Sequence, residues 1–302
     1  MMTSTMSART PFTTRTPAPL LLALALAGCV QTPVAPAAAT ASTEAPTLPP
    51  ELRSARFILL GEVHDNPLHH AWRAQWLRTL LADGRPTRVL FEQLDRAKDA
   101  ELRQARATAP TDSAAIARAG GLDEKAWRWP LHQPLFDAAL AGGADITGGN
   151  LARDAVRSVV RQGPAAVPAD LQPLLDAPGW TAEQQRATEA DIEQGHCGAL
   201  PPSQLAPMAL AQRTRDAAMA QAMLAAPAGT RVVLIAGNGH VRDDRGVPHH
   251  LRVAGVPPAQ IASVGFIEVG DTPAPGTYGR TVTTPRTERP DPCEAFGKKT
   301  GS

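Results

Sequence analysis

The chain has 302 residues, which is enough for one large domain or two small ones. Its formal net charge of +1 gives no electrostatic reason to expect a nucleic-acid partner. Only 4% of the residues are aromatic, against 24 Gly and 29 Pro, so we expect a core of Leu, Val and Ala between many short loops.

The first residues have the pattern of an export signal. Arg9 and Arg15 precede an apolar run at 20–27 that is too short to span a bilayer. The run ends in Leu26-Ala27-Gly28-Cys29, which resembles a bacterial lipobox. Residues 1–28 are therefore predicted to be a lipoprotein signal peptide, with Cys29 as the lipidated residue. The alternative is an ordinary secretory signal in which the cysteine occurs by chance.

The predicted lipid would place the protein in the cell envelope of a Gram-negative bacterium. Several acyl chains on one residue anchor a protein stably without a transmembrane helix. Val30 follows the cysteine where an Asp would favour the inner membrane, so we expect the outer membrane. Residues 29–50 are rich in Ala, Pro and Thr and are predicted to be a disordered tether.

Two cysteines remain after Cys29, namely Cys197 and Cys293. In an oxidising export compartment this pair favours a disulfide that ties the C-terminal tail to the segment 195–198. The alternative is that Cys197, next to His196, is a ligand or a nucleophile. An exported free thiol would be prone to oxidation, so the disulfide is the preferred interpretation.

The segment 57–70 has the pattern of a strand, a polar loop and a helix. Phe57–Leu60 is an apolar run typical of a buried parallel strand. Asn66 can cap the following helix, and Pro67 suits its first position. The loop between them carries Glu62 and His64, and ligands bind at this end of the strands in open α/β sheets.

Later apolar runs also end in polar residues. Thr87–Phe91 is followed by Glu92, the predicted strand Ala144–Asn150 ends in Asn150, and Arg231–Ala236 is followed by Gly237-Asn238-Gly239-His240. Ile261–Val269 is a further predicted strand. Strands that alternate with helical segments predict an α/β fold, with a mostly parallel central sheet flanked by helices.

The remaining segments complete the predicted domain, residues 51–296. Residues 151–226 are predicted to be a helical insertion, in which Thr181 and Gln184 form a capping-box pattern. Arg215, Met219 and Met223 lie along one face of its last helix, where we expect core packing for the methionines. From Gly270 the chain is rich in Pro and Thr, and we expect a loosely structured tail that includes residues 297–302.

If the predicted strands are neighbours, their polar ends meet at one edge of the sheet. The residues expected to converge there are Glu62, His64, Glu92, Asn150, Asn238 and His240. Two histidines and two carboxylates can bind a divalent metal, act as acid and base, or hold a larger cofactor.

These residues resemble a known family. Gly61-Glu-Val-His64 and Gly237-Asn-Gly-His240 match the paired G-x-x-H motif of the Tiki superfamily, which includes TraB, erythromycin-esterase-like and ChaN-like proteins. The finer resemblance is to the ChaN-like haem-binding lipoproteins, and it spans about residues 52–296. It rests on the segments 60–66 with His69 and His70, 91–93, 211–220, 236–242 with 246–248, and 291–294.

The resemblance implies a haem-binding protein connected with iron uptake, without catalytic activity. Its implied partners are haem, a second copy of the chain around the haem, an outer-membrane receptor and the membrane itself. The family's expected iron ligand is a tyrosine, and this chain has one, Tyr278. His132 is a possible replacement ligand near Trp127 and Trp129, unless the tryptophans are core and His132 caps a helix.

The other cofactor-binding residues follow from the same hypothesis. Arg215 or Arg242 would meet the haem propionates, and His69 and His70 complete the predicted haem-binding set. The alternative function is a metal-dependent hydrolase of the erythromycin-esterase-like type. In that case Glu62, His64 and His240 would bind the metal, and the same three with Glu92 would be catalytic, because a bound metal makes water a nucleophile.

Overall fold

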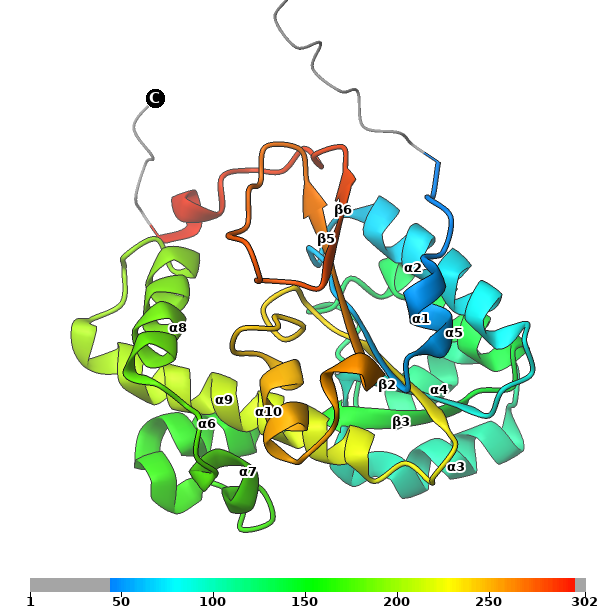
Figure 1. The fold of residues 1–302 in the computed structure, drawn as a ribbon, viewed down its shortest axis with the longest axis horizontal. Coiled ribbons are helices and arrows are strands. Elements are labelled where there is room, and N and C mark those ends of the chain that lie inside the picture. The colour runs from blue at the N-terminus through cyan, green and yellow to red at the C-terminus, as the bar shows by residue number, and fades with distance from the viewer. Residues whose placement is uncertain (1–43, 297–302) are drawn as a thin grey trace, which may run out of the picture. The chain divides into compact units, whose positions relative to one another are not determined.

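The computed structural model describes residues 44–296 and contains the predicted α/β architecture. Its sheet has six strands, all parallel, in the order β3-β2-β4-β1-β5-β6 (Figure 1). The strands are β1 Phe57–Leu60, β2 Thr87–Asp95, β3 Asp145–Asn150, β4 Arg231–Ile235, β5 Ile261–Glu268 and β6 Arg280–Thr284. The predicted fold class is confirmed.

Helices cover both faces of this sheet (Figure 1). Those that come before β3 are α1 Pro50–Ser54, α2 Pro67–Leu81, α3 Asp99–Thr108, α4 Ser113–Ala119 and α5 Gln133–Ala141. Those that follow β3 are α6 Arg153–Gln162, α7 Gln172–Asp176, α8 Ala182–Gly195, α9 Pro202–Leu224 and α10 Val247–Val253. The first group packs on one face, and α9 and α10 pack on the other.

Strand β1 shows why the sequence predicts a central strand. All four of its side chains are fully buried. Ile58 and Leu60 point into the cluster formed with α2 and α5, whereas Phe57 and Leu59 join the cluster formed with α9 and α10. A strand covered on both faces requires a continuous apolar run and not an alternating one.

The helical insertion packs through its long helix α9. The predicted capping box of α8 is present, with Thr181 and Gln184 each bonding the other's backbone. Met219 and Met223 are fully buried in the core, as expected for that face of α9.

The packed region begins a few residues before position 51. Leu48 and Leu52 are buried in the core, and the indole N–H of Trp76 donates to the carbonyl of Pro46 over 2.7 Å. The last residues of the predicted tether therefore pack against α2. The predicted signal peptide, Cys29 and the tail 297–302 lie outside the described residues. Within residues 44–296, no helix has the length and hydropathy needed to cross a membrane.

The segment after Gly270 differs from the expected loose tail, because it adds strand β6 to the sheet. Val264 to Glu268 pair with Arg280 to Thr284 in parallel register. β6 consists of β-branched residues after Arg280; Val282 and Thr284 are buried, and Arg280, Thr281 and Thr283 are exposed. A short edge strand with this alternation is hard to recognise within a segment rich in Pro and Thr.

The predicted disulfide between Cys197 and Cys293 is present. It fixes the chain beyond β6 to the segment between α8 and α9 (Figure 1). Arg289 fastens the same chain to the sheet edge, through ion pairs with Glu268 at 2.6 Å and with Asp65 at 2.9 Å.

Candidate functional site

The site lies where two neighbouring strands send their connections to opposite faces of the sheet. β1 and β4 are adjacent and parallel. The helix after β1, α2, packs on one face, and the helix after β4, α10, packs on the other. Such a point leaves a crevice beyond the carboxyl ends of the strands, and the loops 61–66 and 236–246 border it.

The loop after β1 is fixed by its own side chains. Asn66 caps α2 by accepting from the N–H of Leu68 over 3.0 Å. The backbone N–H of Val63 donates to Nδ1 of His69 over 2.9 Å, and Nε2 of His69 lies 2.8 Å from the Thr284 hydroxyl. His69 is thus a buried structural residue that links this loop to β6.

Glu62 and His64 form the first carboxylate–histidine pair of the site. Oε1 of Glu62 lies 2.8 Å from Nδ1 of His64, and its Oε2 forms an ion pair with Arg73. The side chains of Glu62 and Arg73 are fully buried, whereas that of His64 is 50% exposed. A buried carboxylate with a buried counter-charge therefore orients an accessible imidazole.

The pair is packed from two sides. The ring of Trp127 meets His64 edge to face, with centroids 5.1 Å apart. The Cε1–Nε2 edge of His64 lies against the backbone of Gly237, where a Cβ atom would approach these ring atoms to 2.8 and 2.9 Å. A glycine is therefore needed at position 237 for the ring to lie where it does.

Glu92, Arg215, His240 and Asp216 form a second buried network. Oε1 of Glu92 accepts from Arg215 at 2.6 Å and lies 3.2 Å from Nε2 of His240, and its Oε2 accepts from the N–H of Gly237 at 2.7 Å. Nδ1 of His240 lies 2.5 Å from Oδ1 of Asp216. His240 is thus held between two carboxylates.

The charges in this network support one another. Burial opposes ionisation of Glu92, but His240 and Arg215 outweigh it and hold the pKa of Glu92 well below its usual range. Burial also opposes protonation of His240, but Glu92 and Asp216 raise its pKa above the usual value. Burial raises the pKa of Asp216 despite the neighbouring His240. The arrangement favours an imidazolium at position 240.

Asn150 joins the second network to β3. Its Nδ2 donates to the carbonyl of Glu92 at 3.0 Å, and its Oδ1 accepts from Nε of Arg215 at 3.2 Å. The side-chain amide of Asn238 donates instead to the carbonyl of Phe266 at 2.6 Å. Asn150 therefore orients Arg215, while Asn238 ties the loop after β4 to β5.

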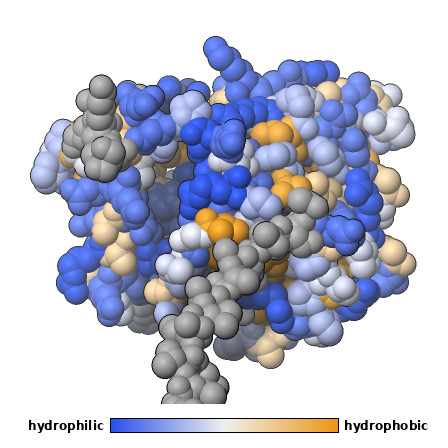
Figure 2. All heavy atoms as spheres, turned by 90° about the horizontal axis from the view of Figure 1, so that it is seen from above, coloured by the Kyte–Doolittle hydropathy of each residue, from blue (hydrophilic) through white to orange (hydrophobic). Residues whose placement is uncertain are grey.

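A cavity of about 620 Å³ opens over these two networks. Its floor includes His64, Glu92, Asn150 and Arg215. Its walls are Gln93, Leu94, Asp95, Lys98, Gly121, Asp123, Ala126, Trp127, Leu151, Ala152, Arg153 and Val156. Figure 2 looks onto the carboxyl edge of the sheet and shows a hollow bordered mostly by hydrophilic side chains.

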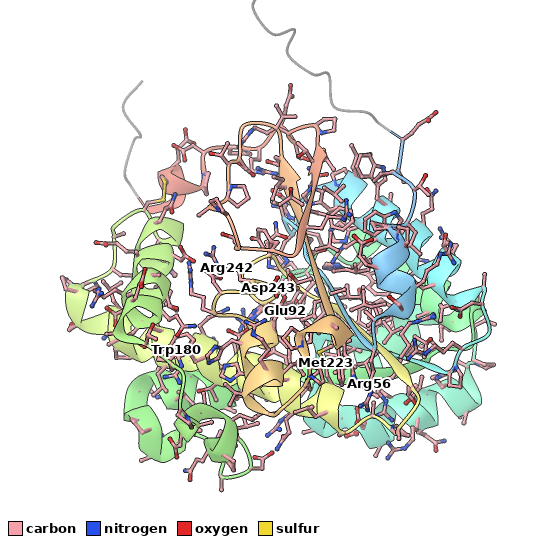
Figure 3. All side chains as sticks on the ribbon, viewed as in Figure 1. Arg56, Glu92, Trp180, Met223, Arg242 and Asp243 are labelled. Atoms are coloured by element: carbon pink, nitrogen blue, oxygen red, sulfur yellow. A yellow bond between two sulfur atoms is a disulfide. The ribbon has the colours of Figure 1, made fainter. Side chains whose placement is uncertain are left out.

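The structure brings together the polar residues that follow the strands, but five of the six predicted haem-binding residues do not line the cavity, and Arg215 does. His69 and His70 are buried on α2. Tyr278 packs against Gly265, and its pKa is raised by burial among residues of the α9 and α10 face. Arg242 pairs with Asp244 at 2.8 Å in the loop after β4, where Figure 3 labels it. His132 is buried beside His70 with ring centroids 4.5 Å apart.

The predicted metal ligands Glu62, His64 and His240 do not share a coordination point. His64 and Arg73 occupy the two oxygens of Glu62, and both nitrogens of His240 face carboxylates. Across residues 44–296, the three-residue group whose ligand atoms converge within 4.8 Å is Glu62, His70 and His132. This geometry does not favour the metal-dependent hydrolase.

The sequence analysis did not identify several residues that the structure places at the candidate site. Arg73 lies one helical turn after His69 and His70 on the buried face of α2, and a charged residue among apolar neighbours was the available signal. Gln93 is buried in the cavity wall, and neither atom of its side-chain amide has a hydrogen-bond partner. Lys98 and Arg153 gave no signal, because only the fold brings them to the cavity.

Comparisons with known proteins agree with this architecture. A family model described as haem-binding uptake, Tiki superfamily, ChaN matches residues 48–251. A structure of ChaN from Campylobacter jejuni with cofacial haem is 22% identical, with a TM-score of 0.62, and the match covers 74% of this chain and 85% of that chain. A search of curated proteins gives no match.

Two other solved structures are less similar. The type III effector HopBA1 is 11% identical with a TM-score of 0.44, over 78% of this chain and 90% of that chain. A variant of the erythromycin esterase EreC is 16% identical with a TM-score of 0.41, over 76% of this chain and 75% of that chain.

The structural likeness to Campylobacter ChaN concerns the fold. The family model goes further, because its match from residue 48 to residue 251 spans more than half of the 302 residues and includes both G-x-x-H loops. On this match, the chain belongs to the ChaN family of haem-binding uptake proteins in the Tiki superfamily.

Proposed function

We propose that this protein binds haem in the cavity beside His64 and handles it during iron uptake. The observation that carries the proposal is the family match over residues 48–251, which includes the residues of the cavity floor. The solved relative from Campylobacter jejuni binds haem cofacially, which supports the same ligand for this chain.

The lining of the cavity suits an amphipathic, planar ligand. Leu94, Trp127, Leu151 and Val156 provide apolar and aromatic surface. Lys98, Arg153 and Arg215 lie in the same lining; Arg215 pairs with Glu92 and Arg153 lies 3.9 Å from Asp123, so Lys98 is the best candidate to meet a haem propionate. Cofactor sites combine apolar surface with convergent polar groups, and this lining has both.

His64 is the residue of this cavity that suits haem iron. Its Nδ1 faces the buried Glu62 carboxylate at 2.8 Å, and its Nε2 makes no hydrogen bond with any described residue. Metal-binding histidines commonly donate their other ring N–H to a carboxylate, which sets the tautomer. Because the Nε2 edge lies against Gly237, the half-exposed ring would turn outward about its side-chain bonds to reach the iron.

When bound, haem supplies the iron and the macrocycle, and the protein supplies the ligand and the polarity of the surroundings. Glu62 orients His64 through Nδ1, and Arg73 compensates the charge of Glu62 from within the core. Trp127 packs edge to face on the imidazole and covers part of it.

The location and partners belong to the same proposal. The lipobox-like segment ending at Cys29 supports an exported lipoprotein in the outer membrane, and the disulfide supports an oxidising compartment. Pairing of two copies around haem is tested by the mass of the haem-loaded protein in solution. The proposed outer-membrane receptor is tested by cross-linking in intact cells.

Haem binding itself is tested by titrating haemin into the purified soluble protein. We expect a saturable shift of the Soret band, with the spectrum of a histidine-ligated haem. His64→Ala should abolish that ligation and weaken binding at least tenfold. Tyr278→Phe is the matched control and should bind as the unchanged protein does, because Tyr278 lies away from the cavity.

Two results would contradict parts of the proposal. If the folded protein shows no saturable shift, haem is not the ligand of this cavity. If haem binds equally well after His64→Ala but is lost after Tyr278→Phe, the cavity beside His64 is the wrong site.

A further inference from the structure

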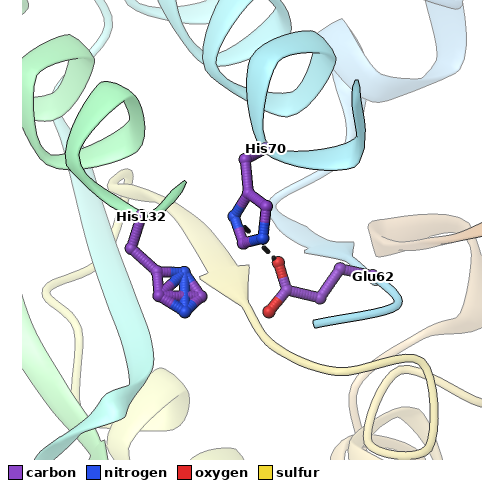
Figure 4. A group of neighbouring side chains, drawn as sticks. All are labelled: Glu62, His70 and His132. Atoms are coloured by element: carbon purple, nitrogen blue, oxygen red, sulfur yellow. Dashed lines mark ion pairs between the residues drawn. The ribbon is translucent and has the colours of Figure 1, made fainter. Parts of the chain in front are cut away.

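A second cluster of ligand-type atoms lies beneath the cavity, on the other side of Glu62. Glu62, His70 and His132 come from the loop after β1, from α2 and from the turn before α5. Figure 4 shows their side chains pointing toward one another. One ligand atom from each lies within 4.8 Å of the others, and all three residues are buried.

The hydrogen bonds around His70 determine which of its nitrogens can accept. Nε2 of His70 lies 2.9 Å from the carbonyl oxygen of His64, so the proton of a neutral imidazole belongs on Nε2. Nδ1 then presents a lone pair, and it lies 3.3 Å from Oε2 of Glu62, which also accepts. Arg73 is the donor next to both acceptors, because it pairs with Glu62 and its NH2 lies 3.3 Å from Nδ1 of His70. A metal ion would take the place of that guanidinium between the two acceptors.

His132 is the member of this cluster whose ring nitrogens both lack a hydrogen-bond partner. It is 1% exposed. Its ring meets that of His70 with centroids 4.5 Å apart and that of Trp127 at 5.7 Å. Buried polar groups are nearly always satisfied, so an imidazole with two orphaned nitrogens indicates that a ligand is missing beside it.

We propose that Glu62, His70 and His132 bind one divalent transition-metal ion, Zn²⁺ or Fe²⁺, in a buried centre distinct from the haem cavity. Two imidazoles and one carboxylate form a ligand set that both ions accept. The contact of His70 with the carbonyl of His64 supplies the second hydrogen bond that orients a metal-binding histidine. The site differs from the predicted set, since it uses His70 and His132 in place of His64 and His240.

Arg73 is the main electrostatic obstacle to this ion. Its guanidinium pairs with Glu62, and its NH2 lies 3.3 Å from Nδ1 of His70. Arg73 also donates to the carbonyl oxygens of His69 and Leu60, at 3.1 and 3.2 Å. These two bonds can hold the guanidinium while its NH2 withdraws from Glu62, so metal and Arg73 compete for one carboxylate oxygen.

The competition between Arg73 and the metal predicts opposite effects of two kinds of substitution on metal affinity. Arg73→Met removes the competing cation and should tighten metal binding, whereas a substitution of any ligand should abolish it. A structural role for the cluster predicts no metal binding in any of these variants.

The experiment uses Co²⁺ as a spectroscopic probe and Zn²⁺ as a competitor. Because the site is enclosed, the protein is unfolded with its disulfide intact and refolded with Co²⁺, and unbound metal is then removed. We expect one bound cobalt per chain by elemental analysis, visible d–d absorption of a nitrogen- and oxygen-ligated ion, and displacement by Zn²⁺.

His132→Phe is the informative variant, with His249→Phe as its matched control. His249 is also a buried histidine, but it packs against Trp180. We expect His132→Phe to lose the cobalt spectrum and His249→Phe to keep it. His132→Leu replaces the Phe variant if the larger ring prevents folding.

Two outcomes would overturn the metal centre. One is a refolded wild-type protein that retains no cobalt, and the other is retention of the full spectrum in the His132 variant. Haem titration of the same samples is a separate measurement, so failure of the metal centre leaves the haem proposal untouched.

Discussion

Acid should destabilise this protein strongly, because five of its histidines are buried in the neutral form. They are His69, His70, His132, His249 and His250. Burial lowers their pKa values from 6.5 to about 4 for His69, His70 and His249, about 3 for His250 and about 2 for His132. In the unfolded chain these imidazoles bind protons near pH 6.5, and in the folded protein they do so only at lower pH.

The sign of the effect follows from proton linkage. Between about pH 4 and 6.5 the unfolded state binds more protons than the folded state, so the free energy of unfolding rises with pH. Each such histidine should lower that free energy by about 1.2 kcal/mol between pH 7 and pH 5.5, or roughly 6 kcal/mol for five. This is comparable to the whole stability of a typical domain.

His240 works in the opposite sense in a different window. Its pKa is raised in the folded protein, so its contribution is complete below pH 6.5 and is lost as pH rises through its folded value. Below pH 6.5 it is protonated in both states and adds little to the slope.

Urea unfolding between pH 5 and 7.5, with a chelator present, measures the effect. His132→Phe should reduce the loss between pH 7 and 5.5 by about 1.2 kcal/mol, because one titrating group is removed. A free energy of unfolding that stays constant over this range would show that these histidines are accessible to protons in the folded state. The reasoning would then be refuted.

Three further substitutions test the fold and the site. Replacing Cys197 and Cys293 together by Ser should lower the free energy of unfolding by about 4.7 kcal/mol, since the cross-link joins positions 96 residues apart; urea curves that superimpose with those of the oxidised protein would contradict this. Gly237→Ala should leave haem binding intact or tighten it, because its Cβ would lie 2.8 and 2.9 Å from ring atoms of His64 and push the ring outward, as the proposed ligation requires; a tenfold weaker haem titration would contradict that movement. Asn66→Ala should destabilise by about 2 kcal/mol, as a buried cap is lost, and thermal melting at the wild-type temperature would argue against that role.

Much of the site could be predicted because parallel strands end at one edge. Glu62, Glu92 and His240 each lie within four residues after an apolar run, and a parallel sheet places the ends of such runs at one edge. Arg215, a predicted cofactor-binding residue, lies at the same edge and pairs with Glu92. None of these inferences required knowledge of how a helix packs.

The rest depended on packing that leaves no local pattern. Whether His132 points into a cavity or into the core is decided by how the segment before α5 folds against α2, which periodicity does not reveal. Tyr278 could not be placed because strand β6, next to it, was not recognised. Arg73 was overlooked because its counter-charge, Glu62, lies in the loop after β1, and only the packing of α2 brings the two side chains together.

The order of strands in the sheet has a consequence for synthesis. β1 is the first strand made, yet its partners are β4 and β5, which begin at residues 231 and 261. Until those segments emerge, four fully apolar residues at the centre of the future sheet have no strand to pair with. Such long-range pairing slows folding and exposes unpaired strand edges to other chains. If the chain is exported as proposed, we expect a chaperone to hold the N-terminal half until translocation is nearly complete.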